Sequence, residues 1–405
     1  MSRTCRRYAT GPGRASERVR VLSLNGGSSS LKAALWEIDA HGEVRLADAT
    51  VSGLGIAAAT LRLRDGGGVR IADAAVVARD PAAAVPLVAD AFTEHGFAAP
   101  EAVGHRLVHG GPDLGAPTRV DDGLLATLRR LVSFAPLHLP AEIASIEAVA
   151  ARAPALPQVV CFDTAFHRGM PDVARRLPLP RAAHDAGIRR YGFHGLSYEY
   201  VCERVGGAAA GRLVMAHLGN GASLAAVRDG KPVDTTMGLT PTGGLMMGTR
   251  TGDLDPGALV HWMRAHDAGA EALARLVDHE SGLAGVSGTT ADMQALLAAR
   301  ATSVAAAEAV DLFCWIARKH VGAMAASLGG LDTLVFTGGI GERGADIRAG
   351  ICAGLEHLGV ELDAARNASH APTISLPGRS CAVRIVPTDE DRMIARHTHA
   401  VLAAA

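Results

Sequence analysis

The sequence contains few aromatic residues and almost no lysine. Aromatic side chains make up 4% of the 405 residues, and lysine occurs only at positions 32, 231 and 319, so arginine carries nearly all of the positive charge. The 40 basic and 41 acidic residues leave a net charge of −1. General binding to nucleic acid or to an anionic membrane needs a basic excess, so neither partner is expected. The hydrophobic fraction of 48% predicts a folded chain with cores of Ala, Val, Leu and Ile.

Several familiar signatures are also absent. The six cysteines form no C-x-x-C pair, which argues against a zinc site or a disulfide framework and favours a reducing cytoplasm. Cys161, within an apolar run, is expected in the core. No apolar run reaches about 18 residues, so no membrane span is expected. Neither a P-loop nor a G-x-S-x-G elbow occurs. Residues 1–18 are basic and lack the apolar segment of a secretory signal, and we expect a disordered extension.

Two segments about 190 residues apart share one pattern. Residues 19–38 and 213–231 each contain an apolar strand, a turn of small residues and a second apolar strand. Ser30-Leu31 of the first aligns with Ser223-Leu224 of the second. This weak repeat predicts two similar α/β domains, each with a loop suited to anions.

The rest of the chain alternates between helical and strand patterns. Helices are expected at 81–95, 121–132, 141–153, 255–278, 291–299, 304–328 and 392–404. Short strands are expected to about residue 75, and further strands at 102–105, 158–163, 331–337 and 382–387. A glycine loop is expected between the strand near 335 and the helix after it, and an acidic turn at 388–391.

Three loops are candidates for contact with phosphate or a nucleotide. Asn25–Lys32 combines two glycines, three serines and one lysine, and His217–Ser223 forms a second loop of small residues. The third, Gly339–Gly344, matches G-x-G-x-x-G, with Glu361 about 20 residues further on. Dinucleotide binding is the weaker reading of it, because the motif does not open a βαβ unit. A plain polar turn is the alternative for each loop.

Two arginines are flanked by glycine, which leaves room for a ligand. Arg106 lies in GHRLVHGG and Arg250 in MGTRTGD, and a planar guanidinium suits carboxylate and phosphate oxygens. Asp163 ends a strand and His194 follows RRYGF; either could be functional or a satisfied hydrogen-bond partner. His138 is held between two prolines. Glu390 is either a turn or cap acid or an oxygen ligand for Mg²⁺.

Taken together, these motifs resemble the acetate kinase family, within the group that also contains sugar kinases, heat-shock cognate chaperones and actin. VLSLNGGSSSLK, GHRLVHGG, APLH-x-P, FDTAFH, RRYGFHG, HLGNGAS, MGTRTGDLDPG, FTGGIGE and PT-x-E follow in the family's order over residues 19–400. The resemblance implies an α/β fold of two duplicated actin-like (ribonuclease H-like) domains around a cleft. The expected division is 19–166 plus 391–405 for the N-terminal domain and 167–390 for the C-terminal domain.

The resemblance also implies roles for individual residues. Asn25 and Glu390 are similar to the magnesium-associated pair, where Mn²⁺ is a possible substitute. Arg106 resembles the carboxylate-binding arginine, Arg250 and His194 the groups around the transferring phosphoryl, and Asp163 the acid that positions the carboxylate. The expected acyl pocket consists of Val108, Leu137, His138, Phe193 and Pro241. The expected nucleotide contacts are Lys32, His217, Leu218, Gly219, Asn220, Gly221, Asp292, Met293, Gln294, Gly339, Ile340, Gly341, Glu342 and Arg343.

Three positions depart from the family's pattern. The residues after APLH read Leu-Pro-Ala-Glu, ending at Glu142, where Asn-Pro-Ala-Asn is usual. Gln294 stands where an arginine is commoner, and Arg343 where an asparagine is commoner.

The implied activity is reversible transfer of the ATP γ-phosphoryl to acetate, giving acetyl phosphate and ADP, in a cytoplasmic homodimer. One alternative is a kinase of propionate or butyrate. Another is an NAD-dependent enzyme or a non-catalytic nucleotide-binding module.

Overall fold

The computed structural model describes residues 18–27, 29–56 and 58–404. The predicted N-terminal extension therefore lies outside the described residues, apart from residue 18. The strands are β1 Val19–Gly26, β2 Ser30–Asp39, β3 Gly42–Ser52, β4 Ala59–Asp65, β5 Arg70–Val76, β6 Ala102–Leu107, β7 Thr118–Arg119, β8 Gln158–Phe162, β9 Arg212–Leu218, β10 Ala222–Arg228, β11 Lys231–Thr235, β12 Thr333–Thr337 and β13 Ala382–Ile385.

The α-helices are α1 Pro81–Glu94, α2 Asp122–Arg130, α3 Leu139–Arg152, α4 Asp172–Arg175, α5 Arg181–Asp185, α6 Gly195–Arg204, α7 Pro256–Ala265, α8 Ala270–His279, α9 Gly282–Ser287, α10 Met293–Ala299, α11 Val304–Leu328, α12 Gly338–Arg343, α13 Ala345–Cys352, α14 Ala364–Ala368 and α15 Glu390–Ala403. Among the helices of the described ranges, none is long and apolar enough to cross a membrane.

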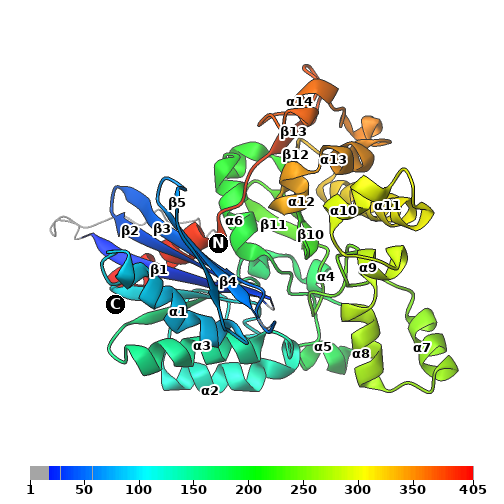
Figure 1. Cartoon of the computed structure of the whole chain (residues 1–405). Coiled ribbons are helices and arrows are strands. Elements are labelled where there is room, and N and C mark those ends of the chain that lie inside the picture. The colour runs from blue at the N-terminus through cyan, green and yellow to red at the C-terminus, as the bar shows by residue number, and fades with distance from the viewer. Residues whose placement is uncertain (1–17, 28, 57, 405) are drawn as a thin grey trace, which may run out of the picture.

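Two sheets lie side by side and share one topology (Figure 1). The first has the order β5-β4-β3-β2-β1-β6-β8-β7, and the second β11-β10-β9-β12-β13. In both, an antiparallel hairpin (β1–β2 and β9–β10) has a third antiparallel strand on one side and two parallel strands on the other. The predicted duplication is therefore confirmed, and the fold is the duplicated actin-like α/β fold.

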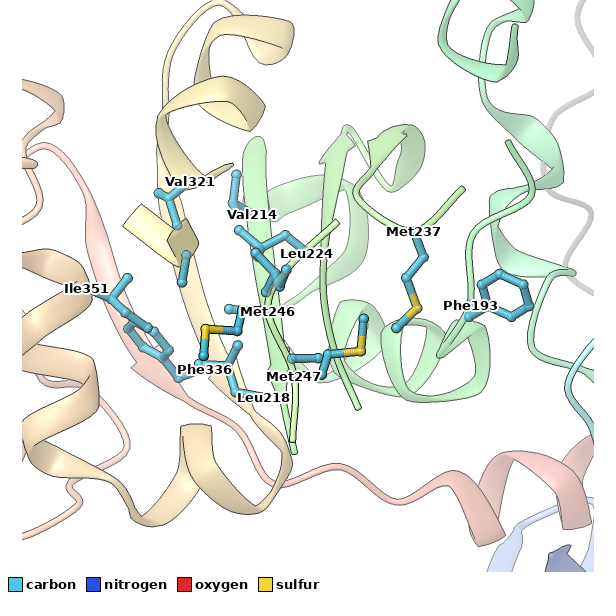
Figure 2. Close-up of a cluster of buried hydrophobic side chains, with 14 of the residues drawn as sticks. Phe193, Val214, Leu218, Leu224, Met237, Met246, Met247, Val321, Phe336 and Ile351 are labelled. Atoms are coloured by element: carbon cyan, nitrogen blue, oxygen red, sulfur yellow. The ribbon is translucent and has the colours of Figure 1, made fainter. Parts of the chain in front are cut away.

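The second sheet supports a large hydrophobic core (Figure 2). Val214, Leu224 and Phe336 from the sheet pack with Val321 of α11, and the core extends through Met246 and Met247. Helix α11 has 25 residues, and both of its ends are capped. Ser303 accepts a hydrogen bond from Ala306 N at the start, and Gly329 takes the left-handed conformation at the end, with φ +70°.

The last helix returns to the first sheet. Helix α15, red in Figure 1, contacts β1, β2, β6 and β8, and Ala395 belongs to the cluster around Trp36. Its approach to β6 is so close that a Cβ at Gly104 would lie 2.2 Å from Thr398 Oγ1. These contacts accord with grouping 391–405 with the first half, although the domain boundaries themselves stay a prediction.

Three details of the predicted elements were wrong. The helix expected at 255–278 is two helices, because the chain turns between α7 and α8, where Asp267 has φ +47°. The glycine loop after β12 is the short helix α12, which follows directly on the strand. The acidic turn at 388–391 overlaps the first turn of α15, which begins at Glu390 with Asp389 as its N-cap.

Candidate active site

The two hairpin turns face each other across a cavity of about 590 Å³. The first half contributes Asn25, Gly27, Ser30, Lys32, Arg45 and Arg106. The second half contributes His194, His217, Gly219, Asn220, Gly221, Gly338 and Gly339. Thr388 to Asp391, at the start of α15, complete the lining. The cavity thus gathers the predicted anion loops with Arg106, His194 and Glu390, and we call it the cleft.

Arg106 and Asp163 form a buried ion pair beside the cleft. Strand β6 carries Arg106, and Asp163 directly follows the neighbouring parallel strand β8. The Arg106 Nε and Nη2 atoms donate to Asp163 Oδ2 at 3.0 and 2.5 Å, and Nη1 donates to Gly26 O at 3.4 Å. Asp163 is fully buried, and its Oδ1 atom has no hydrogen-bond partner. Burial disfavours the guanidinium, but Asp163 and then Glu390 outweigh it and raise the pKa of Arg106.

His194 is held in an uncommon backbone conformation. Its φ of +58° lies in the left-handed region, which is strained for a residue with a side chain and often marks a functional site. Gly195 N donates to Asp163 O at 2.9 Å, and a Cβ on Gly195 would come within 2.1 Å of that oxygen. The glycine therefore lets the His194 turn lie directly against the backbone of Asp163.

The His194 ring is half-buried at the edge of the cleft, and it is neutral. Burial, the stacked His217 ring and the nearby arginines lower its pKa well below the ordinary value. Its Nδ1 atom lies 2.8 Å from Ser223 Oγ, which lies 2.6 Å from the Tyr198 hydroxyl. Burial raises the pKa of Tyr198, so this phenol keeps its proton. When Tyr198 donates to Ser223 and Ser223 donates to Nδ1, the imidazole proton is on Nε2, and this atom can donate toward the cleft.

Arg250 lies near Gly221 of the second hairpin turn, as His194 does. A Cβ on Gly221 would lie 3.3 Å from His194 Nε2 and 3.8 Å from Arg250 Nη1, so both groups flank this glycine. Arg250 Nη1 donates to Pro241 O at 3.2 Å. Burial lowers the pKa of Arg250 and Asp278 opposes the shift, but a guanidinium remains a cation. Two groups that can donate hydrogen bonds to an anion therefore lie beside the second hairpin turn.

The residues predicted for the acyl pocket fall into two groups. Leu137 and His138 line a cavity of about 30 Å³ together with Arg106. Burial, with Arg250 and Arg106, lowers the pKa of His138 to about 4, so this ring is neutral. Val108 and Phe193 are buried in the core, and Pro241 contacts Arg250; these three line neither this cavity nor the cleft.

Next to the cleft lies a second cavity of about 800 Å³. Most of the predicted nucleotide contacts line it, namely Gly219, Asn220, Asp292, Met293, Gln294, Gly339, Ile340 and Arg343. Gly219, Asn220 and Gly339 line both cavities, so the two cavities adjoin each other. Leu218, Gly341 and Glu342 line neither. The Glu342 carboxylate instead accepts hydrogen bonds from Gly338 N and Thr388 N and so joins α12 to the segment before α15.

Oxygen-bearing side chains meet at the start of α15. Asn25 Nδ2 donates to Glu390 Oε2 at 2.8 Å, which leaves the Asn25 carbonyl and one Glu390 oxygen for other partners. Burial opposes ionisation of Glu390, but Arg106 and the Asn25 hydrogen bond outweigh it and lower its pKa. The neighbouring Asp391 has a buried Oδ1 without a partner, and burial with Glu390 raises its pKa to about 7. Within the described ranges no three His, Cys, Asp or Glu side chains form a metal cluster.

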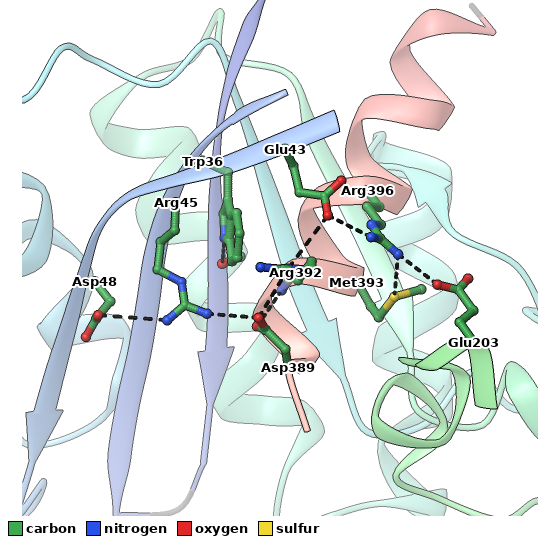
Figure 3. Close-up of polar contacts among 10 residues, drawn as sticks. Trp36, Glu43, Arg45, Asp48, Glu203, Asp389, Arg392, Met393 and Arg396 are labelled. Carbon is green, nitrogen blue, oxygen red and sulfur yellow. Dashed lines mark hydrogen bonds and ion pairs between the residues drawn. The ribbon is translucent and has the colours of Figure 1, made fainter. Parts of the chain in front are cut away.

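A charge network fixes this segment to the first half of the chain (Figure 3). Asp389 accepts from Arg45 at 2.9 Å and pairs with Arg392 at 3.2 Å. Both guanidinium groups lie over the Trp36 ring, at 4.8 and 5.4 Å from its centroid. Further along α15, Arg396 bridges Glu43 of β3 and Glu203 of α6. The network therefore fixes the residues on either side of Glu390 to the first sheet.

Sequence reasoning missed four residues of the site. Ser223 and Asp391 stand inside motifs that were already singled out, so their signal was present. Tyr198 reaches Ser223 from one turn into α6, and Arg45 reaches Asp389 across 344 positions. Neither has a sequence signal, because only the tertiary fold brings them close.

The fold and the site define a class of protein, the phosphotransferases. Each of the two α/β units of the actin-like fold contributes an anion-suited turn, and arginine, histidine and acidic groups lie between the two turns. The chain belongs to the acetokinase family, whose model matches residues 20–396. Its members are phosphotransferases that act on a carboxyl group. This membership disfavours the NAD-dependent reading.

Named relatives cover nearly the whole chain. An acetate kinase of Rhodopseudomonas palustris is 44% identical over 393 residues, which are 93% of this chain and 97% of the relative. The crystal structure of Porphyromonas gingivalis acetate kinase is 37% identical, with a TM-score of 0.84, over 95% of this chain and all of the other. A propionate kinase from Francisella tularensis is 33% identical, with a TM-score of 0.87 over the same shares.

Proposed function

We propose that the protein catalyses the reversible, magnesium-dependent transfer of the ATP γ-phosphoryl to acetate, giving acetyl phosphate and ADP. The observation that supports this most is the position of the Arg106–Asp163 pair. It lies beside a cleft that adjoins a large cavity lined by the predicted nucleotide segments. A nucleotide in the large cavity would direct its phosphates toward Arg106.

In this proposal Arg106 binds the acetate carboxylate. Asp163 holds the guanidinium through Nε and Nη2, and Nη1 has only a long contact to Gly26 O, so it is the donor most available to a ligand. Acetate is already ionised near pH 7, since the reference pKa of a carboxyl is about 4. No general base is needed, and Asp163 acts as a positioning residue.

His194 and Arg250 would stabilise the phosphoryl group in flight. Phosphoryl transfer depends on in-line positioning and on neutralising charge on the equatorial oxygens. The neutral His194 would donate from Nε2, and Arg250 would supply a cation beside the same glycine, Gly221. Because both reactants are anions, these groups offset the repulsion between them.

The residues at the start of α15 fit a magnesium ion. Mg²⁺ usually binds one or two carboxylates and otherwise phosphate oxygens and water, so a cluster of three protein acids is not required. Glu390 and the Asn25 carbonyl would hold the ion, and the orphaned Asp391 oxygen offers a further contact. The chemistry supplied by the bound ion, or by Mn²⁺ in its place, is neutralisation of phosphate charge.

Propionate is the second candidate acceptor, supported by the likeness to a propionate kinase.

We also propose a homodimer. Helices α7 and α8 bury no side chain, and Figure 1 shows them at one edge of the molecule. Leu254, Val260 and Trp315 are exposed, the last by 55%. A second copy of the protein packed on this side would cover them. Sedimentation velocity can measure whether the protein is a dimer.

We also place the protein in the cytoplasm. The five described cysteines form no disulfide, in keeping with a reducing compartment.

Trapping acyl phosphate with hydroxylamine tests the proposed reaction. The protein is incubated with ATP, Mg²⁺ and one of acetate, propionate or butyrate, and the hydroxamate is measured. Acetate is expected to give the highest kcat/KM, with propionate lower, since one methylene changes discrimination by about 1–3 kcal/mol. No hydroxamate with any acid would overturn the proposal, and a preference for butyrate would overturn acetate as the substrate.

A further inference from the structure

Glu142 is a buried carboxyl beside the proposed carboxylate-binding arginine. It lies in the first turn of α3 and is 6% exposed. Both of its oxygens accept the same N–H, that of Val108, with Oε2 at 3.0 Å and Oε1 at 3.2 Å. An ionised carboxylate can accept about four hydrogen bonds, so this one is poorly satisfied when charged. A protonated Glu142 could still hold Val108 through its other oxygen.

The surroundings of Glu142 contain little positive charge to balance it. The cavity of about 30 Å³ that it lines has room for one or two water molecules. Strands β1 and β2, the turn between them and helix α1 contribute no titratable side chain to this cavity, only Leu24, Gly26, Gly27, Leu31 and Pro81. The charged and titratable groups that face it are His105 and Arg106 from β6, His138 from the start of α3, and Asp163 after β8.

Of these groups, only Arg106 is a cation, and Asp163 already pairs with it. Burial lowers the pKa of both His105 and His138 to about 4, so both are neutral at pH 7. Burial raises the pKa of Glu142 to about 7, although Arg106 and the Val108 N–H oppose the shift. An incoming acetate would bring one more negative charge to Arg106, and an ionised Glu142 would repel it.

Given the proposed function, we propose that Glu142 is a positioning residue that couples carboxylate binding to proton uptake. Acetate binds Arg106 while the Glu142 carboxylate takes one proton from solvent. The summed charge of Arg106, Asp163, Glu142 and the bound acetate is then the same as the summed charge of the three side chains before binding. The protonated Glu142 still accepts the hydrogen bond from Val108 N. Val108 directly follows β6, the strand that carries Arg106. The proton returns to solvent when the carboxylate leaves.

Kinetics of the full-length protein test this. KM for acetate is measured from about pH 6 to about pH 9 with saturating ATP and Mg²⁺, a range in which acetate itself stays ionised. In the parent, KM should rise above neutral pH, approaching tenfold per pH unit, because one proton is linked to binding. Glu142→Gln keeps an acceptor for Val108 and cannot ionise, so its KM should be independent of pH. The pH effect falls on KM and not on kcat.

A matched control is available on the same helix. Glu147 is exposed and pairs with Arg129, so Glu147→Gln should show the pH profile of the parent. Calorimetric titration of the parent with acetate, in buffers of different ionisation enthalpy, should show uptake of about one proton at about pH 8. This measurement does not depend on the variant folding.

Equal pH slopes in the parent and Glu142→Gln, or no proton uptake by the parent, would overturn the role of Glu142. Failure of the parent to form acyl hydroxamate would instead overturn the proposed function, so the two failures are distinguishable.

Discussion

Removing the Arg106 guanidinium should destabilise the fold through the partner it leaves behind. Asp163 is fully buried, its Oδ2 accepts both donated hydrogen bonds, and its Oδ1 has none. Arg106→Ala would leave this carboxylate without a cation. Breaking a buried ion pair in this way costs about 3–5 kcal/mol.

The loss should depend on pH, with a definite sign. Burial raises the pKa of Asp163 and Arg106 opposes the shift, so removal of Arg106 raises that pKa further. A carboxyl with a raised pKa in the folded state holds a proton that the unfolded chain releases. The stability of the variant therefore falls as the pH rises from about 4, the unfolded value, to the raised folded value. The variant should lose more free energy of unfolding at about pH 8 than at about pH 5.

Urea unfolding at these two pH values measures the effect, with Arg106→Ala and the double variant Arg106→Ala/Asp163→Asn compared with the parent. The double variant leaves no unpaired charge at positions 106 and 163 and should regain most of the lost stability, but not the activity. Parent-like stability of the single variant at the higher pH would refute the reasoning. So would a double variant that is no more stable than the single one.

Three further outcomes are expected. Arg250→Ala should lower kcat/KM by about 10²–10⁵ with unchanged circular dichroism. The control variant Arg379→Ala removes a surface arginine that pairs with Glu361, and it should keep the kcat/KM of the parent. If both variants had the same kcat/KM, Arg250 would not belong to the site. Leu137→Ala should shift the ratio of kcat/KM toward propionate over acetate by about 1 kcal/mol, roughly fivefold, because Leu137 lines the small cavity beside Arg106, and an unchanged ratio would exclude Leu137 from the acyl pocket. Arg343→Asn should weaken ATP binding with little change in the acetate KM, because Arg343 is exposed at the nucleotide cavity. Tight ATP binding by the variant, or pyrophosphate as the donor in place of ATP, would contradict this.

Much of the fold could be predicted because local patterns repeat. The two hairpins, with their turns of small residues, were visible as a repeat, and the structure gives both the same neighbours in their sheets. Residues of the first two anion loops and Arg106 now line one cleft. They stood out in the sequence because glycine leaves room for a ligand beside a polar or charged residue.

Other features depend on contacts that no local pattern encodes. Arg348 is fully buried and donates to the carbonyls of Gly341 and Glu342 and to Asn367, so it holds α12 in place below the nucleotide cavity. In the sequence it resembles any helical arginine. The helical form of α12 was missed for the same reason, since its glycines favour a loop until Arg348 binds its carbonyls.

The return of α15 to the first sheet also has a consequence for biosynthesis. Trp36, Ala102 and Ala395 share one small hydrophobic cluster, so a face of the earliest strands is completed by a helix made last. As the chain leaves the ribosome, the second sheet has all its strands by residue 385, whereas the first still lacks the helix that covers it. The half that is translated first is therefore the half that finishes folding last, and a chaperone would find its exposed strands on the nascent chain throughout synthesis.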